Sequence, residues 1–324
     1  MRSLVIGGAG AIGSHVVDQL ISLGHDIIVL DNFSNGNLKN LEKSKDEIKF
    51  VLKADIKNQK EIDYLFKKVD YVFLLAASRI LDTMNDPRKA LENNVLGTFN
   101  VLESCVKHKI NKVIYSSSSS VFGDPIFLPV RENHPFQTNS PYAASKIAAE
   151  QFCNTMHQVY DLKIIGLRYF NVYGPRQDYK GIFTTIIPKW LDCIDNCLPI
   201  EIHGDGSQTM DLIYIEDVAR SNICAMNSSI DYGFYNIGTG VETSVNSLAN
   251  ILLSIYNKTA VIKHNNVGIN LVKRRKSSTI LAEQKLNFKS EVPLIDGLMR
   301  LIKWRQNSKS PCANPISVEE PSST

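Results

Sequence analysis

A glycine-rich turn near the start of the chain constrains the fold most. Gly7, Gly10 and Gly13 directly follow the apolar run 3–6 and precede the helically spaced apolar residues of 12–23. Glycine permits a tight turn, lets the backbone approach a pyrophosphate and lets a helix pack closely on a strand. The free N–H groups at the start of the helix also attract phosphate oxygens. The pattern therefore predicts a strand, a dinucleotide-binding turn and a helix.

Short apolar runs alternate with stretches of helical spacing through the first half of the chain. The expected strands cover 3–6, 26–31, 48–52, 71–76, 112–115 and 162–167, and the expected helices include 12–23, 59–68 and 89–107. Continuously apolar strands separated by amphipathic helices indicate a parallel sheet covered on both faces. We therefore predict an α/β fold of the Rossmann type, a doubly wound parallel sheet with a smaller interleaved substrate-binding lobe.

The pattern changes after about residue 170, where proline, glycine and aromatic residues become frequent and the expected strands become short. We predict a dinucleotide-binding domain over 1–170 and a substrate-binding lobe built from 171–211 and 238–307. Apolar runs within 212–237 are expected to return as strands to the first domain. The final stretch, 308–324, is rich in Ser, Pro and Glu, which is typical of a disordered tail.

The composition excludes several classes of protein. A net charge of +3 in 324 residues, with no basic stripe, argues against nucleic-acid binding. The densest basic run, Lys273–Lys276, is either a solvated face or a site that holds a phosphorylated substrate. Six cysteines form no CxxC pair, so we expect no metal site and reduced thiols in the cytoplasm. Because the first strand begins at Ser3 and no apolar run approaches the roughly 20 residues that span a bilayer, we expect neither a signal peptide nor a membrane segment.

Acidic residues end the second and third expected strands. Asp31, followed by Asn32, lies where a carboxylate would bind both hydroxyls of an adenosine ribose. Since this carboxylate would repel a 2′-phosphate, we favour NAD over NADP; a turn-forming role for Asp31 is the alternative. Asp55 could accept a hydrogen bond from the adenine amine, with Ile56 packed on the ring, or it could cap the next helix.

Tyr142 and Lys146 lie one turn apart on the helix that Pro141 starts, so they share a face. The serine run 116–120 follows an expected parallel strand, and ligands of open α/β sheets bind at the carboxyl ends of strands. A phenol with a pKa near 10 is a poor base at pH 7, but a nearby ammonium and an oxidised nicotinamide ring both favour the phenolate. We interpret Tyr142 as a base that Lys146 activates, with a serine relaying the proton. A hydrogen-bonded loop is the alternative for the serines.

Several short motifs along the chain together form a pattern that is specific to one protein family. They are the glycine turn 7–13, Leu75–Ala77, Asn94–Thr98, Ser116–Ser118 followed by Val121–Gly123, Tyr142 with Lys146, Arg168–Arg176, Gly204–Ser207 and Tyr235–Gly238. With these motifs the chain resembles the extended short-chain dehydrogenase/reductases, specifically the NAD-dependent nucleotide-sugar epimerases and dehydratases, over about residues 1–307. It is most similar to UDP-hexose 4-epimerases, including those acting on N-acetylated sugars.

The resemblance implies that Ser118, Tyr142 and Lys146 are catalytic. The residues expected to hold NAD, from the strand ends and from the resemblance, are Gly7, Gly10, Ala11, Ile12, Gly13, Asp31, Asn32, Asp55, Ile56, Leu75, Ala76, Ala77, Arg79, Asn94, Ser116, Tyr142, Lys146 and Tyr169. The residues expected to hold the substrate are Ser78, Ser118, Asn171, Arg176 and Arg274, with Asn171 at the phosphates.

The implied reaction is epimerisation at C4 of a nucleotide-activated hexose through a transient 4-keto sugar. Tyr142 would take the O4 proton as NAD takes the C4 hydride, and the same hydride would return to the other face. Dehydratases of the family carry Thr-Asp-Glu or Thr-Asp-Lys at the serine run, where this chain has only serine. Many relatives carry an arginine before Asp211 that grips the diphosphate; here Met210 replaces it, and Arg176, Arg274 or Arg275 could substitute.

Two other interpretations stay open from the sequence. One is another sugar-nucleotide oxidoreductase of the same fold, such as a reductase, decarboxylase or dehydratase. The other is a non-catalytic NAD-binding protein. Family members commonly dimerise by pairing two helices per subunit into a four-helix bundle, which here would be 88–108 and 142–160. The resemblance therefore predicts a homodimer with a nucleotide-sugar substrate.

Overall fold

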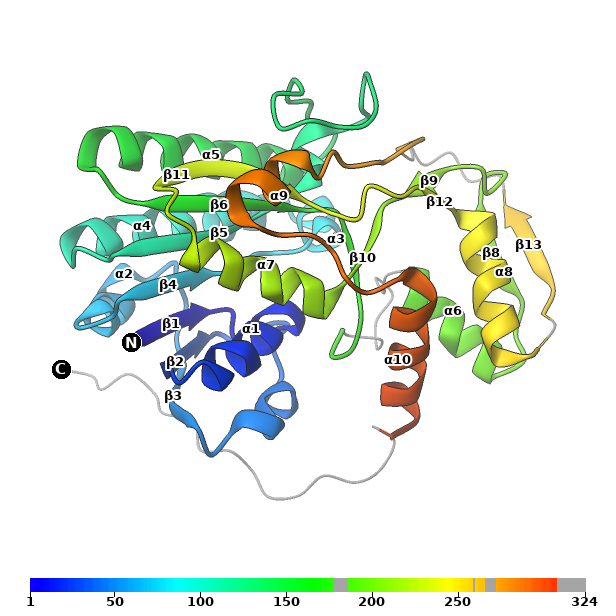
Figure 1. The fold of residues 1–324 in the computed structure, drawn as a ribbon, viewed down its shortest axis with the longest axis horizontal. Coiled ribbons are helices and arrows are strands. Elements are labelled where there is room, and N and C mark those ends of the chain that lie inside the picture. Colours follow the sequence, from blue (N-terminus) through cyan, green and yellow to red (C-terminus); the bar gives the residue numbers. More distant parts are fainter. Residues whose placement is uncertain (178–185, 259, 266–271, 308–324) are drawn as a thin grey trace.

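The structure, a computed structural model, describes residues 1–177, 186–258, 260–265 and 272–307. Its centre is a sheet of seven parallel strands in the order β11-β6-β5-β4-β1-β2-β3 (Figure 1). The strands are β1 (Arg2–Ile6), β2 (Asp26–Asp31), β3 (Ile48–Lys53), β4 (Tyr71–Leu74), β5 (Lys112–Ser118), β6 (Ile164–Tyr169) and β11 (Tyr232–Ile237). The strand order reverses between β1 and β4, which confirms the expected doubly wound sheet and places a ligand crevice at that reversal.

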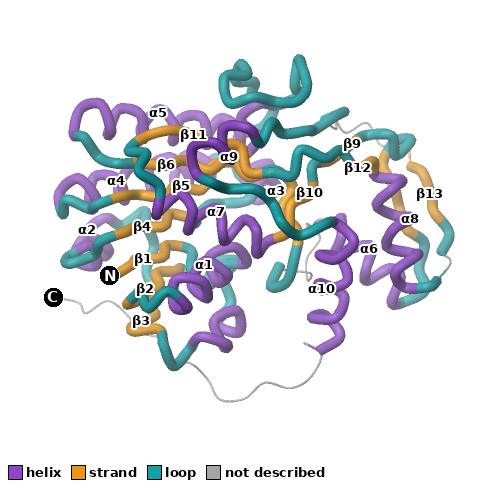
Figure 2. Tube along the Cα trace, in the orientation of Figure 1, coloured by secondary structure: helices purple, strands orange, loops and turns teal. Residues whose placement is uncertain are grey.

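Helices cover both faces of this sheet (Figure 2). One face carries α1 (Ala11–Ser22), α7 (Ile215–Asn227) and α9 (Ile280–Leu286); the other carries α2 (Gln59–Ile62), α4 (Gly97–Lys107) and α5 (Pro141–Tyr160). Successive side chains of a strand point to opposite faces, so each apolar strand supplies both cores. Val5 packs on the α1 side, whereas Leu4 and Ile6 pack on the α4 side. The shorter helical segments are η1 (Leu38–Ser44), η2 (Asp63–Phe66), α3 (Ile80–Asn85), the π-helix η3 (Ala90–Leu96) and η4 (Ser119–Phe122).

A smaller lobe has its own core, built on α6 (Ile186–Asp195), α8 (Val245–Tyr256) and α10 (Leu294–Asn307), with Trp190, Leu248 and Leu301 buried at its centre. Three pairs of short strands accompany these helices. They are β7 (Asn171–Tyr173) with β10 (Leu212–Tyr214), β8 (Ile200–His203) with β13 (Ile262–Asn265), and β9 (Thr209–Met210) with β12 (Thr243–Ser244). Within the described ranges, no helix is long and apolar enough to cross a membrane.

Two segments differ from the expected division between the lobes. The strand that begins at Leu212, β10, pairs with β7 and contributes to both cores: Tyr214 packs edge-on against Tyr173 in the second lobe, with ring centroids 5.6 Å apart, whereas Ile213 is buried in the core of the first lobe. In contrast, α9 packs with the first lobe, since Leu286 and Phe288 are buried in the core beside α1 and α7. The expected strand at the end of 212–237 does lie in the large sheet, as β11 beside β6. The predicted tail, 308–324, lies outside the described residues.

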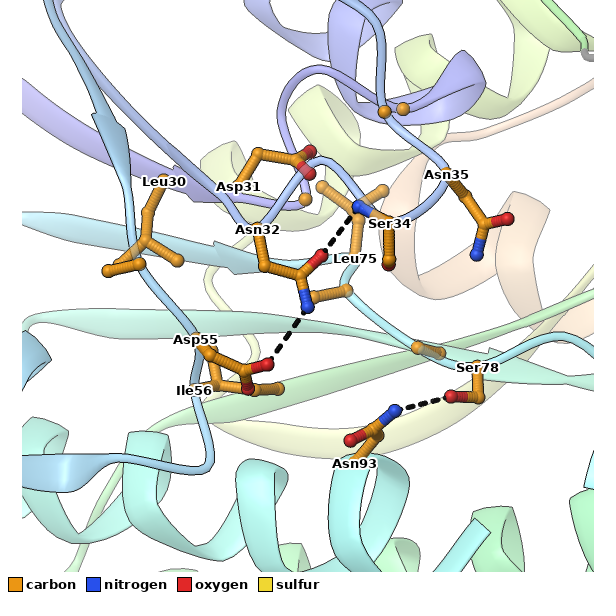
Figure 3. A pocket seen from close by; sticks show the side chains of 16 residues that line it. Leu30, Asp31, Asn32, Ser34, Asn35, Asp55, Ile56, Leu75, Ser78 and Asn93 are labelled. Carbon is orange, nitrogen blue, oxygen red and sulfur yellow. Dashed lines mark hydrogen bonds between the residues drawn. The ribbon is translucent and has the colours of Figure 1, made fainter. Parts of the chain in front are cut away.

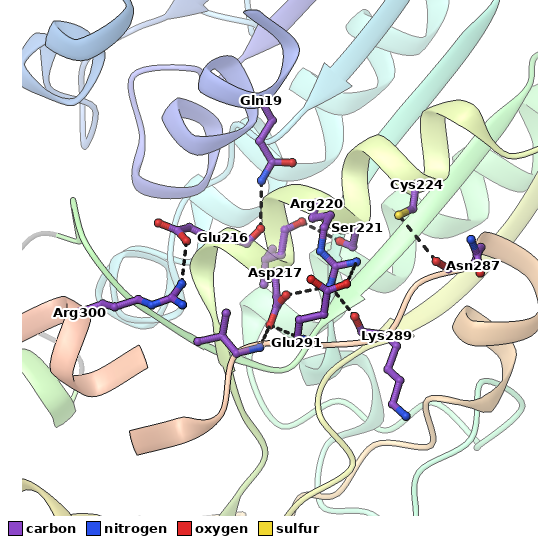
Figure 4. A network of polar contacts seen from close by, with 12 residues as sticks. Gln19, Glu216, Asp217, Arg220, Ser221, Cys224, Asn287, Lys289, Glu291 and Arg300 are labelled. Carbon is purple, nitrogen blue, oxygen red and sulfur yellow. Dashed lines mark hydrogen bonds and ion pairs between the residues drawn. The ribbon is translucent and has the colours of Figure 1, made fainter. Parts of the chain in front are cut away.

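Polar contacts of α7 join the two lobes (Figure 4). The Asp217 carboxylate accepts hydrogen bonds from the backbone N–H groups of Glu291 and Val292, at 3.0 and 2.9 Å, just before α10. Arg300 of α10 reaches the Glu216 carboxylate at 3.4 Å. Helix α7 therefore packs on the large sheet and also holds the C-terminal helix of the second lobe.

Candidate active site

The turn between β1 and α1 leaves room only for glycine at two positions. Gly7 has a φ of +81°, and a Cβ on it would lie 2.6 Å from the Ala76 nitrogen. A Cβ on Gly13 would lie 2.1 Å from the Gly7 carbonyl oxygen. A side chain at either position would push α1 away from the ends of the strands. The N-terminus of α1 therefore lines the cavity described below, which fits the predicted pyrophosphate site.

Asp31 ends β2 as a buried carboxylate beside this turn. It accepts hydrogen bonds from the backbone N–H groups of Ala9, at 3.0 Å, and Phe33, at 2.8 Å. Burial raises the pKa of the Asp31 carboxyl, and these N–H groups oppose the rise. The carboxylate thus stabilises the loop around it, and this geometry is compatible with both sequence interpretations, ribose binding and turn formation.

Figure 3 shows the cavity that Asp31 lines together with Asn32, Asp55 and Ile56. The Asn32 amide donates to the Asp55 carboxylate at 3.0 Å, and the Lys57 N–H donates to its other oxygen at 2.9 Å. Ile56 supplies an apolar wall to the same cavity. A cavity with one apolar wall and a few convergent polar groups fits an adenosine.

Ser78 is held at the border of this cavity by two consecutive asparagines of the π-helix η3. Asn94 accepts from the Ser78 N–H at 2.7 Å and donates to the Ser145 hydroxyl at 3.0 Å, so it is buried and structural. Asn93, which sequence reasoning missed, donates to the Ser78 hydroxyl at 2.6 Å and lines the cavity (Figure 3). Its place next to Asn94 in the Asn-Asn pair is the only sequence signal for it.

A second cavity, of about 360 Å³, adjoins the first and extends from the glycine turn to the carboxyl ends of β5 and β6. It contains many of the residues predicted from sequence. Its lining includes Gly7, Gly10, Ala11, Ile12, Gly13, Leu75, Ala77, Ser78, Arg79, Ser116, Ser118, Tyr142, Lys146, Tyr169 and Arg176. Ala76 lines the first cavity only. The two cavities form one crevice, which is lined by the glycine turn, the strand ends and the tyrosine–lysine pair.

The start of α5 places Tyr142 and Lys146 at this crevice. Ser140 caps the helix, since its hydroxyl accepts from the Ala143 N–H at 3.2 Å, and Pro141 occupies the first turn. One turn later, Lys146 Nζ donates to the Ser116 carbonyl at 2.7 Å and lies 5.8 Å from the centroid of the Tyr142 ring. The helix therefore brings phenol and ammonium to the end of β5.

Burial dominates the titration of both groups. It lowers the pKa of Lys146 to about 8, so the ammonium is still the main form at pH 7. It raises the pKa of Tyr142, while a hydrogen bond with Ser118 lowers it. The protein's own groups therefore leave the phenol protonated at neutral pH, and a further positive charge is required to make it a base.

A buried ion pair lies directly behind these side chains, and sequence reasoning missed it. Arg168 donates to both Glu150 oxygens, at 2.9 and 2.7 Å, and the Ser117 hydroxyl donates to the same carboxylate at 2.5 Å. Glu150 lies one helical turn beyond Lys146, the signal that could have drawn attention to it. The network ties β5, α5 and β6 together and fixes the strand end that carries Ser116 and Ser118.

The end of β6 and the strand β7 supply two further predicted residues. The Tyr169 hydroxyl donates to Asn222 at 3.0 Å, and burial raises its pKa. On β7, the side-chain carbonyl of Asn171 is buried and has no hydrogen-bond partner among the described residues. An unpaired buried acceptor of this kind is costly unless a donor binds it, but Asn171 itself lines neither cavity; its neighbour Val172 lines the second one.

The arginines considered for the diphosphate lie in different environments. Arg176 lines the larger cavity but pairs with Asp18 of α1 at 2.7 Å. Arg79 lines it as well and pairs with Asp82 at 3.1 Å. Arg274 is largely exposed, pairs with Glu242 at 2.6 Å and does not line the cavity. Its neighbour Arg275 instead directs its guanidinium at Ser119, 2.9 Å away.

The comparisons with known proteins define the class to which this fold and site belong. The model of the NAD dependent epimerase/dehydratase family matches residues 3–238. The chain belongs to this family. The UDP-glucose 4-epimerase of Mycolicibacterium smegmatis is 32% identical, over 95% of this chain and 99% of its own length.

Solved structures of epimerases are similar to this chain as well. The UDP-glucose 4-epimerase of Thermotoga maritima, solved with UDP-glucose, is 33% identical with a TM-score of 0.88, covering 96% of this chain and 100% of that chain. The UDP-N-acetylglucosamine 4-epimerase of Methanobrevibacter ruminantium, in complex with UDP-N-acetylmuramic acid, is 31% identical with a TM-score of 0.90, covering 95% and 98%. The expected extended short-chain dehydrogenase/reductase family and Rossmann-type fold are confirmed.

NAD is the cofactor that the family and the geometry support. The close backbone approach at Gly7 and Gly13 fits a dinucleotide, and Asp31 lines the adjoining cavity as a buried carboxylate. The Thermus thermophilus UDP-glucose 4-epimerase, 28% identical with a TM-score of 0.86, covering 95% of this chain and 100% of that chain, was solved with NAD. Relatives also include a UDP-N-acetyl-alpha-D-glucosaminuronate decarboxylase of Bacillus cytotoxicus, 29% identical over 94% of this chain and 97% of its own length. The comparisons thus support a nucleotide-sugar epimerase.

Proposed function

We propose that this chain catalyses epimerisation at C4 of a UDP-activated hexose, glucose and galactose or their N-acetyl forms, with bound NAD. One observation carries the proposal. Ser118, Tyr142 and Lys146 converge at the carboxyl end of β5, in the crevice that also contains the glycine turn. A base, a hydroxyl relay and a cation beside a dinucleotide site are what oxidation and reduction of a sugar carbinol require.

Tyr142 is the proposed base for the proton on O4. Its hydrogen bond with Ser118 allows the serine hydroxyl to orient the sugar hydroxyl and to relay the proton. Lys146, largely protonated at pH 7, supplies one positive charge that favours the phenolate. The chemistry that bound NAD supplies is hydride acceptance from C4, hydride return to the same carbon, and the positive charge of its oxidised ring.

The sugar must turn between the two hydride transfers, and the chain's residues must tolerate both orientations. Tyr142 returns its proton to O4 when the 4-keto group is reduced, so the residue ends each cycle unchanged. Ser78, Asn171 and Arg176 are proposed to hold the nucleotide end of the substrate, which stays fixed while the sugar turns. Ser78 and Arg176 line the crevice, and within the described part of the chain the buried carbonyl oxygen of Asn171 and the buried Nη1 of Arg176 both have no hydrogen-bond partner.

The residues after Ser118 favour epimerisation over dehydration. Ser119 and Ser120 are both buried at the start of η4, and neither can act as the carboxylic acid or amine that expels water from a sugar. A decarboxylase or dehydratase activity is therefore the weaker alternative, although proteins with such names are among the relatives.

The direct test uses purified protein with UDP-glucose, UDP-galactose and their N-acetyl forms, without added NAD, followed by NMR. Interconversion of a C4 pair without net change of the cofactor supports the proposal. Release of carbon dioxide, loss of water or net reduction would assign another reaction of the family, and no change with any sugar would remove the proposed activity.

We also propose that the protein is a homodimer formed by η3, α4 and α5. Large apolar side chains are exposed on two of these helices: Leu91 and Leu96 on η3, and Phe152, Val159 and Tyr160 on α5. Exposed apolar surface is found at protein–protein interfaces. Light scattering over a concentration series should give twice the mass of the chain, and a monomer at every concentration would contradict the proposal. A cytoplasmic location stays a prediction.

A further inference from the structure

Tyr115 is a fully buried tyrosine near the end of β5, one residue before Ser116. Successive side chains of a strand point to opposite faces of a sheet, so Tyr115 and Ser117 both face α5. The Ser117 hydroxyl donates to Glu150 of that helix. The Tyr115 ring contacts Lys146, whose Nζ lies over the ring at 5.0 Å from its centroid. The structure therefore places an aromatic face against the ammonium that is proposed to activate the catalytic phenol.

The Lys146 ammonium has few other partners. Among the described residues it forms no ion pair and donates to one acceptor, the Ser116 carbonyl, at 2.7 Å. The centroid of the Tyr142 ring is farther away than that of Tyr115, at 5.8 Å. A cation within about 6 Å of a ring centroid is attracted by the negative face of the ring, most strongly where water is excluded. Because Lys146 is buried, the Tyr115 ring stabilises a charge that solvent does not.

The titratable groups of α5 and β6 around Lys146 do not replace this contact. Glu150 raises the pKa of Lys146, but its carboxylate is already bound by Arg168 of β6. Burial raises the pKa of the Cys153 thiol far above neutral pH, and it raises the pKa of the Tyr142 phenol as well. Both groups are therefore uncharged at pH 7. The aromatic ring from β5 supplies a stabilising contact that none of these groups provides.

The hydroxyl of Tyr115 does not explain why a tyrosine lies here. It is buried without a hydrogen-bond partner among the described residues, which is unfavourable. A contact through the face of the ring, in contrast, requires an aromatic residue. We propose that Tyr115 is a positioning residue, whose ring holds the Lys146 ammonium, in its charged form, at the end of β5 beside Tyr142. This inference rests on the proposed function for the role of Tyr142, and it adds a residue that lines neither cavity of the crevice.

The test follows the titration of Lys146 by NMR, in full-length protein whose lysines are isotope-labelled at Cε. The resonance of Lys146 is identified by its absence from Lys146→Met. Wild type is compared with Tyr115→Leu, which removes the ring, and with Tyr115→Phe, which keeps the ring without its hydroxyl. Phe73→Leu is the matched control, since Phe73 of β4 is also fully buried but lies in the core on the opposite face of the sheet.

Tyr115→Leu should lower the pKa of Lys146 by roughly one unit, because only the charged form gains from the ring. Since less of the lysine is then charged at pH 7, the alkaline limb of the pH profile of kcat/KM should move to lower pH by the same amount. Tyr115→Phe should keep the titration of wild type and be at least as stable in urea, because it removes an unpaired hydroxyl. Phe73→Leu should lose stability and leave the titration unchanged.

Two outcomes would overturn the proposal. If Tyr115→Leu loses stability but Lys146 titrates as in wild type, Tyr115 only packs the core. If Tyr115→Leu and Tyr115→Phe lower the pKa of Lys146 equally, the hydroxyl and not the ring is responsible. Should Tyr115→Leu fail to fold, pentafluorophenylalanine at position 115 keeps the shape of the ring and reverses its charge distribution. It should lower the pKa of Lys146 as well, and an unchanged titration with it would also reject the proposal.

The NMR titration requires no turnover, so this inference and the proposed function can fail separately. A pKa of Lys146 that depends on the Tyr115 ring, in a protein that epimerises no sugar, rejects only the proposed function. Epimerisation at C4 by a protein in which the titration of Lys146 does not depend on that ring rejects only this inference.

Discussion

Two regions of the molecule each bury a carboxylate, but they stabilise it differently. Behind the proposed catalytic side chains, Glu150 faces the guanidinium of Arg168 through two hydrogen bonds and also accepts from Ser117. At the edge of the second lobe, Asp211 is fully buried with no Lys or Arg within 4.0 Å among the described residues.

Asp211 is stabilised by hydrogen-bond donors alone. It accepts from the backbone N–H and hydroxyl of Thr239, both at 2.7 Å, and from the Gly240 N–H at 3.0 Å. It also accepts from the backbone N–H and hydroxyl of Ser277, at 2.9 and 2.6 Å. The carboxylate thereby ties together three segments that are far apart in the sequence.

A carboxylate paired with a cation and a carboxylate held only by hydrogen-bond donors have different structural roles here. The Glu150 pair joins β5, α5 and β6, which follow one another in the chain and already share a sheet and a core. Its removal would leave a charge unpaired in a rigid region. The Asp211 contacts join three loop segments, and they act together with the backbone bonds of Val130 to Lys276 and Ser278, at 2.7 and 2.8 Å, in placing residues 276–278. The stability of the catalytic region thus depends on the pairing of Glu150 with Arg168. The stability of the junction, meaning the three segments around Asp211, depends on N–H and O–H groups that point at the carboxylate.

The largest expected effect is on chemistry in the catalytic region. Tyr142→Phe removes the proposed base but leaves the Glu150 pair intact. We expect the rate of C4 epimerisation to fall about 10³–10⁴-fold, about 4–5 kcal/mol, with the free energy of unfolding nearly unchanged. Steady-state kinetics and urea denaturation measure the two quantities. An unchanged rate would contradict the assignment of Tyr142.

Breaking the Glu150 pair should act on stability instead. Arg168→Met leaves the buried Glu150 carboxylate without its cation, which should lower the free energy of unfolding by about 3–5 kcal/mol. The double variant Arg168→Met/Glu150→Met should recover much of this loss, because it removes the uncompensated charge as well. Urea denaturation of both variants gives the comparison. A double variant as unstable as Arg168→Met would show that packing, not charge, explains the effect.

The sequence predicts the catalytic region better than the junction, for a physical reason. The glycine turn, Asp31 at a strand end and the Tyr142–Lys146 spacing are local patterns, and the alternation of strands and helices places them at one sheet edge. Arg168 and Glu150, or Asp211 and Ser277, find each other only after folding. The same reason explains why the pairing of β10 with β7 could not be predicted: a three-residue apolar strand does not encode its partner.

Lys146 is a buried cation of the catalytic region that donates to a carbonyl, that of Ser116, rather than to a carboxylate. Its folded-state pKa, about 8, lies below its ordinary value of 10.5. Between these values the unfolded chain binds a proton that the folded protein has released, so Lys146 makes the free energy of unfolding rise with pH, by about 1.4 kcal/mol per unit. Below pH 8 this gain is absent.

Lys146→Met removes that titration. The difference in free energy of unfolding between wild type and the variant should therefore shift in favour of wild type by about 2–3 kcal/mol between pH 8 and pH 10. Urea denaturation at a series of pH values measures it, and other titrating groups cancel in the difference. A difference that is independent of pH, or that shifts the other way, would contradict the burial of this ammonium.

The smallest expected effect tests the junction. Asp211→Asn keeps the size of the side chain but replaces one accepting oxygen with an NH₂ group that faces N–H and O–H donors. Some of the donors of Thr239, Gly240 and Ser277 would then lose their acceptor, at a cost of about 1–3 kcal/mol in the free energy of unfolding. Asp205→Asn is the matched control, since Asp205 is exposed and its carboxylate accepts only from Ser207 among the described residues. If the two variants have the same free energy of unfolding in urea denaturation, Asp211 does not stabilise the junction. If only Asp211→Asn loses stability, a carboxylate without a cation stabilises the junction through hydrogen-bond donors alone.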